Sequence, residues 1–437
     1  MADLSLGGAR PRSSTGRSRS ALVVTVVHNP EDSRIGQRQL KALIATGWDV
    51  TYAAPFGAFG LDVQQSCPAV AGRGSLRCIN VPRAKGRRRF RAWRAARMIM
   101  RSLAQDHDVV LVHDPELVLA AAGLRVRNLI WDVHEDPAAA LQVKSWMPVL
   151  LRRPVAAAWR WAERVAERRH YLLLAEHAYQ QRFRQRHPVV PNSVSVPKVI
   201  TPPGDERVSY LGTVTMSRGC DTMIEVGREL RRRTGSAVKL EVIGDAPDPE
   251  ARQALQSATE AGYLTWLGFM RSEEALTRVS GSLAGLCLLR NLPNYRVSLS
   301  TKIVEYGALG VPVITTPLPL AADLVRSENV GIEVPWNAPS AVVDAILKLR
   351  AEPELRRQMG TNGHKVALRE YDWNRLSADF VRVMEAIADR PPDRMKPRRG
   401  RVFSEQIWAA RWDAEYSSYP THADEDGPVI EGATRRI

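Results

Sequence analysis

Two series of alternating strands and helices, separated by one proline-rich joint, constrain the fold of this chain more than any other feature. Short runs rich in Val, Ile and Leu recur in both halves, for example at residues 21–29, 108–114, 207–213 and 238–245. Helical segments separate these runs, and this alternation is typical of parallel sheets that are covered on both faces. The joint, residues 193–206, has the Pro-rich polar composition of a domain linker. The sequence therefore predicts an α/β fold of two Rossmann-like, doubly wound domains that face an interdomain cleft.

The expected boundaries follow from the same pattern and from a length of 437 residues, which suits two or three domains. We expect a disordered basic tail, a first domain, a second domain, a closing helix and a C-terminal tail at residues 1–20, 21–195, 205–370, 371–389 and 390–437. The first domain is expected to end in a strand at residues 187–194. In the C-terminal tail, residues 403–417 could form one short helix.

The N-terminus and the cysteines predict a cytoplasmic protein. No run approaches the roughly 18 apolar residues of a membrane span. The first 20 residues lack the apolar segment of a secretory signal. The four cysteines have no C-x-x-C spacing, which argues against a zinc site and for a reducing compartment.

The positive charge lies entirely in the first half of the chain. Residues 1–200 contain 31 Lys and Arg against 15 Asp and Glu, a net charge of +16, whereas residues 201–437 have a net charge of −1. Two clusters, residues 83–101 and 150–170, mix Arg with Trp, Phe, Leu and Met at helical spacing. Such clusters suit an anionic membrane surface or nucleic acid, and they are also found as solvated helix faces. Because no nucleic-acid recognition motif accompanies them, we expect no nucleic-acid partner.

Polar residues and glycines follow several of the predicted strands. In open parallel sheets, ligands bind beyond the carboxyl ends of the strands. The turns at these ends contain His28, His113-Asp114, His134-Glu135-Asp136, Arg218-Gly219 and Gly244-Asp245. Because they come from both halves, they predict one site between the two domains.

Residues 294–316 combine a helix start, a cation and a carboxylate. Ser300 or Thr301 can cap the helix, whose free N–H groups suit an anion. Lys302 adds a positive charge in the first turn, and Glu305 lies three residues further on the same face. This arrangement suits a nucleotide-sugar, with phosphate near the cation and sugar hydroxyls near the carboxylate. The alternative is a solvated ion pair between Lys302 and Glu305.

An ordered set of motifs resembles the retaining glycosyltransferases of the GT-B fold, and family 4 in particular. The motifs are VHDPELVL, WDVHEDP, YLGTVTMSRGCDTMIEV, LEVIGD, LTWLGF and NYRVSLSTKIVEYGALGVPVITT, within residues 21–389. The resemblance implies transfer of a sugar from a nucleoside-diphosphate sugar to a saccharide or lipid-linked acceptor. It implies retention of the anomeric configuration, with no metal or other cofactor.

The resemblance also implies roles for individual residues. The catalytic residues are expected to be His134, Arg218 and Lys302. The donor-binding residues are expected to be Gly212, Arg218, Gly219, Gly244, Leu267, Gly268, Ser300, Thr301, Lys302 and Glu305. The acceptor site or cleft is expected to include Arg34, Gly36, His113, Asp114, Glu135 and Asp136.

The physical reasons for these assignments differ, and each has a structural alternative. Arg218 suits phosphate because its fork matches phosphate oxygens, but a surface Arg at a helix start is also common. Glycines such as Gly212 let a backbone approach phosphate closely, but glycine also serves ordinary strand-end turns. Glu305 matches the carboxylate that holds ribose hydroxyls. His134 is either a residue near the donor sugar or a hydrogen-bonded structural histidine.

Two positions depart from the family pattern. Val297 stands eight residues before Glu305, where many members have a Glu, and Thr213 stands where an Arg is usual. The first departure leaves the donor sugar open, and the second places the phosphate charge mainly on Arg218 and Lys302.

Three other functions remain open at this point. A nucleotide-sugar 2-epimerase would use the same fold and alter its donor without an acceptor. A basic nucleic-acid- or membrane-binding protein would use the Arg clusters. A silent scaffold would bind a donor without turnover. If the chain is a transferase, the charge of its first half places it peripherally on the inner face of the membrane.

Overall fold

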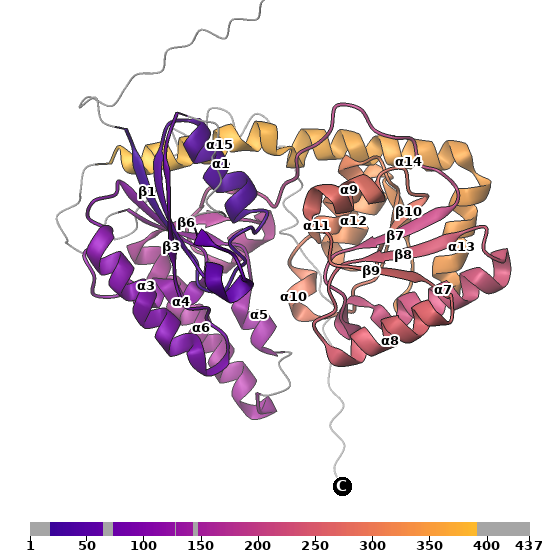
Figure 1. Cartoon of the computed structure of the whole chain (residues 1–437), viewed down its shortest axis with the longest axis horizontal. Coiled ribbons are helices and arrows are strands. Elements are labelled where there is room, and N and C mark those ends of the chain that lie inside the picture. Colours follow the sequence, from indigo (N-terminus) through magenta and orange to yellow (C-terminus); the bar gives the residue numbers. More distant parts are fainter. Residues whose placement is uncertain (1–17, 64–72, 127, 143–146, 391–437) are drawn as a thin grey trace, which may run out of the picture.

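A computed structural model describes residues 18–63, 73–126, 128–142 and 147–390. They form two six-stranded sheets, each with a series of helices, side by side along the long axis of the molecule (Figure 1). The expected basic tail up to residue 17 and the expected helix at residues 403–417 lie outside the described residues. In the described part of the chain, no helix is both long and apolar enough to span a membrane.

The first sheet is wholly parallel, with the strand order β3-β2-β1-β4-β5-β6. Its strands are β1 (Ser20–Val24), β2 (Asp49–Ala54), β3 (Leu76–Asn80), β4 (Val109–Val112), β5 (Leu129–Val133) and β6 (Tyr171–Leu174). Its helices are η1 (Ile35–Leu40), α1 (Lys41–Ala45), η2 (Phe56–Phe59), η3 (Gly86–Arg88), α3 (Arg89–Leu103), α4 (Pro115–Ala120), α5 (Pro137–Gln142), α6 (Val149–Arg169) and η4 (His177–Arg182). Val23 packs in the core on one face and Leu22 in the core on the other, so both faces are covered.

The second sheet repeats this topology, with the order β12-β11-β10-β7-β8-β9. Its strands are β7 (Arg207–Leu211), β8 (Lys239–Ile243), β9 (Thr265–Gly268), β10 (Ala284–Cys287), β11 (Val313–Thr315) and β12 (Gly331–Glu333). Its helices are η5 (Met216–Arg218), α7 (Cys220–Thr234), α8 (Pro249–Glu260), α9 (Ser272–Val279), α10 (Pro293–Arg296), α11 (Thr301–Ala308), α12 (Pro319–Glu328), α13 (Pro339–Ala351), α14 (Pro353–Val366) and η6 (Ala367–Tyr371). Both sheets therefore have the doubly wound order expected of a Rossmann-like fold.

One helix connects the second unit back to the first. Helix α15 (Trp373–Ala388) follows α14 along the top of the molecule and covers the first sheet (Figure 1). Trp373 and Phe380 on α15 pack in the same apolar core as Val23 and Trp48. Burial of these side chains fixes the chain's last described helix to its first domain.

The strand predicted at residues 187–194 is not formed. This segment makes only two isolated bridges, from Val189 to Leu174 and from Val194 to Asp372. Pro188 and Pro191 have no N–H to donate, so they cannot sustain a ladder of hydrogen bonds there. The first sheet consequently ends at β6.

Candidate active site

The loop after β7 is the place where two predicted cationic residues meet. Lys302, in the first turn of α11, is 5% exposed, and its Nζ donates a hydrogen bond of 3.0 Å to the hydroxyl of Tyr210. That hydroxyl donates to the carbonyl oxygen of Thr213, 2.9 Å away. Nη1 of Arg218 reaches the same carbonyl oxygen over 3.5 Å. The structure thus brings Lys302 and Arg218 to one loop, as a diphosphate site would require.

Two glycines shape this loop. Gly219 has a φ of +85° and begins α7, and a Cβ there would lie 2.3 Å from the carbonyl oxygen of Leu288. Gly212 has a φ of +113°, and a Cβ there would face the Lys302 side chain at 3.7 Å. Only glycine adopts these positive φ angles without strain, and only glycine fits beside the carbonyl oxygen of Leu288. The backbone can therefore pass close to the cations.

The neighbouring strand ends are also glycines. The amide of Gly244 donates to the carbonyl oxygen of Gly268 over 2.7 Å, and a Cβ on Gly244 would lie 2.0 Å from the carbonyl oxygen of Gly212. The structure therefore brings these three predicted residues together at the ends of β7, β8 and β9. Leu267 is half-buried against the core beside α11. Of the three strand-end glycines Gly212, Gly244 and Gly268, only Gly268 has open space in the direction of a Cβ.

The start of α11 differs from the prediction. Ser300 occupies the N-cap position, but its side chain makes no capping hydrogen bond, and Thr301 is the first helical residue. The predicted side-chain cap is therefore wrong. The first turn is closed by the backbone instead, where the amide of Ile303 donates to the carbonyl oxygen of Ser300. This leaves the first amides without a side-chain acceptor, as an anion site at a helix N-terminus needs.

Glu305 faces a cation of the first domain. Burial raises the pKa of Glu305, and the positive charges of Arg38 and Lys302 oppose this rise. Burial likewise lowers the pKa of Arg38, and Glu305 opposes that change. No ion pair within 4.0 Å joins Lys302 and Glu305 in the described structure, so the solvated pair considered above is not observed. Sequence analysis missed Arg38, whose only signal was its place one helical turn after Arg34.

Arg34 lies inside the first domain. Its Nε and Nη2 donate to the two carboxylate oxygens of Asp132 over 2.8 and 2.7 Å, and Gln39 donates to the same carboxylate over 2.9 Å. Burial alone would raise the pKa of Asp132, but Arg34 holds it well below its usual range. His113 Nε2 lies 2.7 Å from Oε1 of Gln39, and burial lowers its pKa to about 3, so His113 is neutral at pH 7.

Two further first-domain residues that were predicted to line the cleft, Asp114 and Gly36, have structural roles. Asp114 is buried, and its Oδ2 accepts hydrogen bonds from Thr25 Oγ1 at 2.9 Å and from the amide of Val26 at 2.5 Å. It therefore fixes the loop after β1. A Cβ on Gly36 would lie 2.7 Å from the carbonyl oxygen of Pro30, so Gly36 serves a close backbone approach.

Asp136 holds two helices together. One carboxylate oxygen accepts from the amide of Ala139 at the start of α5, and the other accepts from Arg160 of α6 over 2.6 Å. By contrast, Glu135 is exposed. His134 is half-buried; its Nδ1 lies 3.1 Å from the carbonyl oxygen of Asp132.

Glu176 joins the two domains, and sequence analysis missed it. Its buried carboxyl group accepts a hydrogen bond of 3.4 Å from Nδ2 of Asn192 and lies beside Leu299 and Ser298 of the second domain. Burial raises its pKa to about 8, against the opposing effect of these neighbours. Val297 beside them packs against the apolar core of the first domain. The position where the family pattern described above has a Glu is thus an apolar interdomain contact in this chain.

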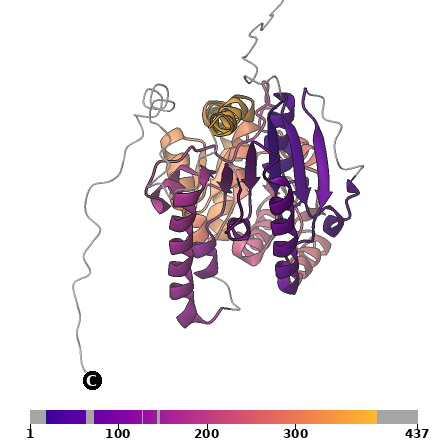
Figure 2. The same ribbon diagram turned by 90° about the vertical axis from the view of Figure 1, so that its left-hand side faces the viewer.

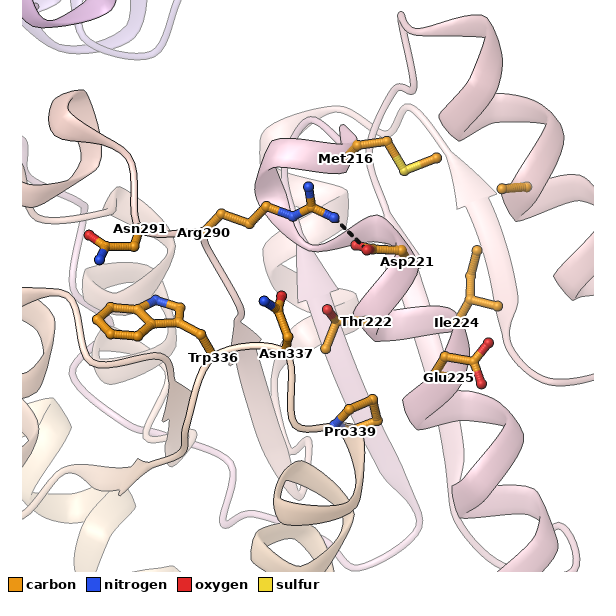
Figure 3. A pocket seen from close by; sticks show the side chains of 11 residues that line it. Met216, Asp221, Thr222, Ile224, Glu225, Arg290, Asn291, Trp336, Asn337 and Pro339 are labelled. Atoms are coloured by element: carbon orange, nitrogen blue, oxygen red, sulfur yellow. Dashed lines mark hydrogen bonds and ion pairs between the residues drawn. The ribbon is translucent and has the colours of Figure 1, made fainter. Parts of the chain in front are cut away.

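A separate cavity of about 670 Å³ lies between α7 and the loops after β10 and β12 (Figure 3). Its lining includes Asp221, Thr222, Arg290, Trp336 and Asn337, and an ion pair joins Arg290 to Asp221. None of the predicted donor-binding residues lines it. The cavity is therefore lined by other residues than the site at the ends of β7, β8 and β9.

Two doubly wound parallel sheets, a helix that returns to the first domain and a cationic loop at the strand ends define a glycosyltransferase of the GT-B fold. Within this chain, residues 195–366 match the family described as "Glycosyl transferases group 1", and the chain is similar to this family. It is a glycosyltransferase that uses a nucleoside-diphosphate sugar.

Known relatives are distant. The chain is 24% identical over 301 residues to the "Phosphatidyl-myo-inositol mannosyltransferase" of Mycobacterium leprae, an alignment that covers 65% of this chain and 74% of that protein. It is 26% identical over 185 residues to a "GDP-mannose-dependent alpha-(1-6)-phosphatidylinositol monomannoside mannosyltransferase" of Mycobacterium tuberculosis, covering 41% of this chain and 48% of that one.

Solved structures agree on the fold. Sucrose-phosphate synthase from Thermosynechococcus elongatus superposes with a TM-score of 0.65 at 17% identity, over 85% of this chain and 99% of that chain. WaaG, described as a glycosyltransferase involved in lipopolysaccharide biosynthesis, has a TM-score of 0.58 at 13% identity, over 83% of this chain and 98% of that one.

Proposed function

We propose that this enzyme transfers a hexose with retention of the anomeric configuration and without a side-chain nucleophile or a catalytic metal. The observation that carries this proposal is the convergence of Lys302 and Arg218 on the loop at Thr213. Cations held there stabilise the negative charge that develops on a departing diphosphate.

The proposed step needs only donor and acceptor atoms. The bond between the anomeric carbon and the phosphate oxygen breaks, and its electron pair stays on that oxygen. The acceptor hydroxyl forms the new bond from the same face, and its proton passes to the departing phosphate oxygen. Glu305 holds the ribose hydroxyls, while Gly244, Leu267 and Gly268 frame the base. His134 contacts the donor sugar.

A lipid-linked acceptor is supported by one face of the first domain. Helices α3, α4 and α6 all pack on the same face of the first sheet (Figures 1 and 2). Seven of the ten exposed large apolar side chains in the described residues lie on these helices. They are Phe90, Met98, Leu119, Val149, Leu150, Leu151 and Trp161. Apolar patches of this kind mark interaction surfaces.

The charge on the same face is mostly positive, and the one acidic residue of α4, Glu116, pairs with Arg89. Helix α3 contains no acidic residue, and the two acidic residues of α6 point inward. Glu163 pairs with Arg160 and Arg182, and Glu167 accepts hydrogen bonds from two backbone amides and His187. The outward face is therefore apolar and cationic, which favours an anionic bilayer. Two relatives are named for phosphatidylinositol-based acceptors, which supports the same acceptor class.

The test is a binding screen of the full chain against UDP-, GDP- and other nucleoside-diphosphate sugars, followed by turnover with lipid extracts. We expect one donor class to bind and its sugar to appear in a product with unchanged anomeric configuration by NMR. Incubation with the donor alone should return it unaltered. Formation of an epimer in that control would favour the 2-epimerase, and failure of every donor to bind would overturn the proposal.

A further inference from the structure

Two histidines from different strand ends meet beside the proposed sugar position. His28 follows β1 and His134 follows β5, and their Nε2 atoms lie 3.0 Å apart. The carboxylate of Glu135 places a third donor atom near them, and the three potential ligand atoms lie within 4.8 Å of one another. Glu135 is exposed, so its side chain is free to move toward the imidazoles.

The hydrogen bonds behind the pair determine which nitrogens face each other. Nδ1 of His134 lies 3.1 Å from the backbone carbonyl oxygen of Asp132, which can only accept. Nδ1 of His134 therefore carries the hydrogen, and Nε2 presents its lone pair toward His28. Metal-binding histidines usually have this support, with one ring N–H donated to a carbonyl or carboxylate.

The carboxylate of Asp114 lies next to His28. Oδ1 of Asp114 lies 3.3 Å from Nε2 of His28, while Oδ2 of the same carboxylate is bonded to the loop after β1. The ligand set proposed for the ion consists of the two imidazole nitrogens and the carboxylate oxygen of Glu135. Three protein ligands of these types, with a fourth position left open, are typical of zinc. Imidazole ligands also suit cobalt and nickel, whereas Mg²⁺ prefers oxygen ligands.

We propose that His28, His134 and Glu135 bind a divalent transition-metal ion of the Zn²⁺ or Co²⁺ type, and that this ion competes with the donor sugar for His134. Binding replaces the direct contact between the two Nε2 atoms by a bond from each of them to the ion. The ion is an inhibitor in this proposal and takes no part in sugar transfer. The competition rests on the proposed function, whereas the metal site itself does not.

The metal site is tested on the full chain after treatment with a chelator. Titration with CoCl₂ should produce visible absorption bands at one ion per chain, and ZnCl₂ should abolish them. A hundred-fold excess of MgCl₂ should leave them unchanged. Absence of cobalt bands at millimolar metal, or their loss to Mg²⁺, overturns the site.

Variants locate the ion. His28→Gln and Glu135→Gln should each weaken cobalt binding at least about ten-fold, the smallest loss typical of changes around metal ligands. The matched control is His107→Gln, because His107 bonds to Thr51 and the backbone of Leu103 and lies outside this cluster. Unchanged binding in both variants overturns the assignment, and circular dichroism checks that each variant is folded.

Donor binding in the presence of ZnCl₂ tests the competition. We expect the apparent Kd of the bound nucleoside-diphosphate sugar to rise with zinc in the native chain, and the same rise in Glu135→Gln to require at least about ten-fold more zinc. If saturating zinc leaves the apparent Kd of the donor unchanged in the native chain, the proposed competition is wrong. If no donor binds in metal-free protein, the proposed function fails while the cobalt result still decides the site.

Discussion

The ammonium group of Lys302 lies 3.0 Å from the hydroxyl oxygen of Tyr210 and 4.1 Å from the centroid of its ring. The cation is buried, and among the described residues no carboxylate lies within 4.0 Å of it. A buried charge without a counter-ion is unfavourable. A donor diphosphate would supply the missing negative charge, and Tyr210 holds the cation in place until it arrives.

Removal of this cation should slow the reaction far more than it affects folding. We expect Lys302→Ala to lose about 2–4 kcal/mol of transition-state stabilisation, as when an oxyanion donor is removed. The measurement is kcat/KM with the donor found in the screen. Arg232→Ala is the matched control, because Arg232 is an exposed cation on α7. Full turnover by Lys302→Ala would refute the phosphate role.

Loss of the Tyr210 hydroxyl should have a smaller effect. Tyr210→Phe keeps the ring below the ammonium but removes the hydrogen bonds to Lys302 and to the carbonyl oxygen of Thr213. We expect the transition-state stabilisation, calculated from the ratio of the kcat/KM values, to fall by about 0.5–1.5 kcal/mol, the usual net contribution of one hydrogen bond. A decrease as large as that of Lys302→Ala would show that the hydroxyl does more than position the cation.

The pair between Arg34 and Asp132 should matter for stability. Both side chains are buried, so Asp132→Asn leaves the guanidinium without its counter-ion. We expect the free energy of unfolding in urea to fall by about 3–5 kcal/mol. Asp323→Asn removes an exposed partner of Arg326 and should change it by less than about 1 kcal/mol. Equal effects of the two substitutions would show that the pair between Arg34 and Asp132 does not behave as a buried ion pair.

Glu176 should make stability fall as the pH rises through the neutral range. Its folded pKa of about 8 exceeds the ordinary value of 4.5, so between these values the folded chain holds a proton that the unfolded chain has released. Its stabilising effect is complete below about pH 4.5 and declines toward pH 8 by up to about 1.4 kcal/mol per pH unit. The pKa of His113, lowered to about 3 from 6.5, acts in the opposite sense only below pH 6.5.

The window from pH 6.5 to 8 therefore separates the two groups. Unfolding in urea across this window should show the decline in the native chain and a much flatter profile in Glu176→Gln. Glu354→Gln, an exposed change on α14, is the control and should retain the native slope. An unchanged slope in Glu176→Gln would show that another group titrates.

The apolar cationic face should bind anionic vesicles. We expect the full chain to float with vesicles rich in anionic lipid at low salt, and to dissociate as salt screens its arginines. Leu150→Glu should reduce flotation, because Leu150 is 91% exposed at the start of α6. Val199→Glu is the control, since Val199 is exposed in the linker, away from these helices. Equal flotation of the two variants, or no binding at low salt, would refute the surface.

Much of the fold was predictable because local patterns specify it. The apolar runs became parallel strands, and the order of strands and helices gave two doubly wound sheets. The sequence also predicted that Lys302 and Arg218 would meet, since the carboxyl ends of neighbouring parallel strands share one edge. It failed at residues 187–194, where apolar residues suggested a strand and two prolines prevented its ladder.

Local sequence patterns thus specify which elements form and which polar residues reach the edges of the sheets. The contacts that each of those residues makes depend instead on the folded arrangement of the chain. Arg34 pairs with Asp132, 98 positions away, and Glu176 meets Leu299 of the other domain. Periodicity reports the local environment of a residue, whereas the partner of a buried charge depends on which distant segments pack around it and exclude water.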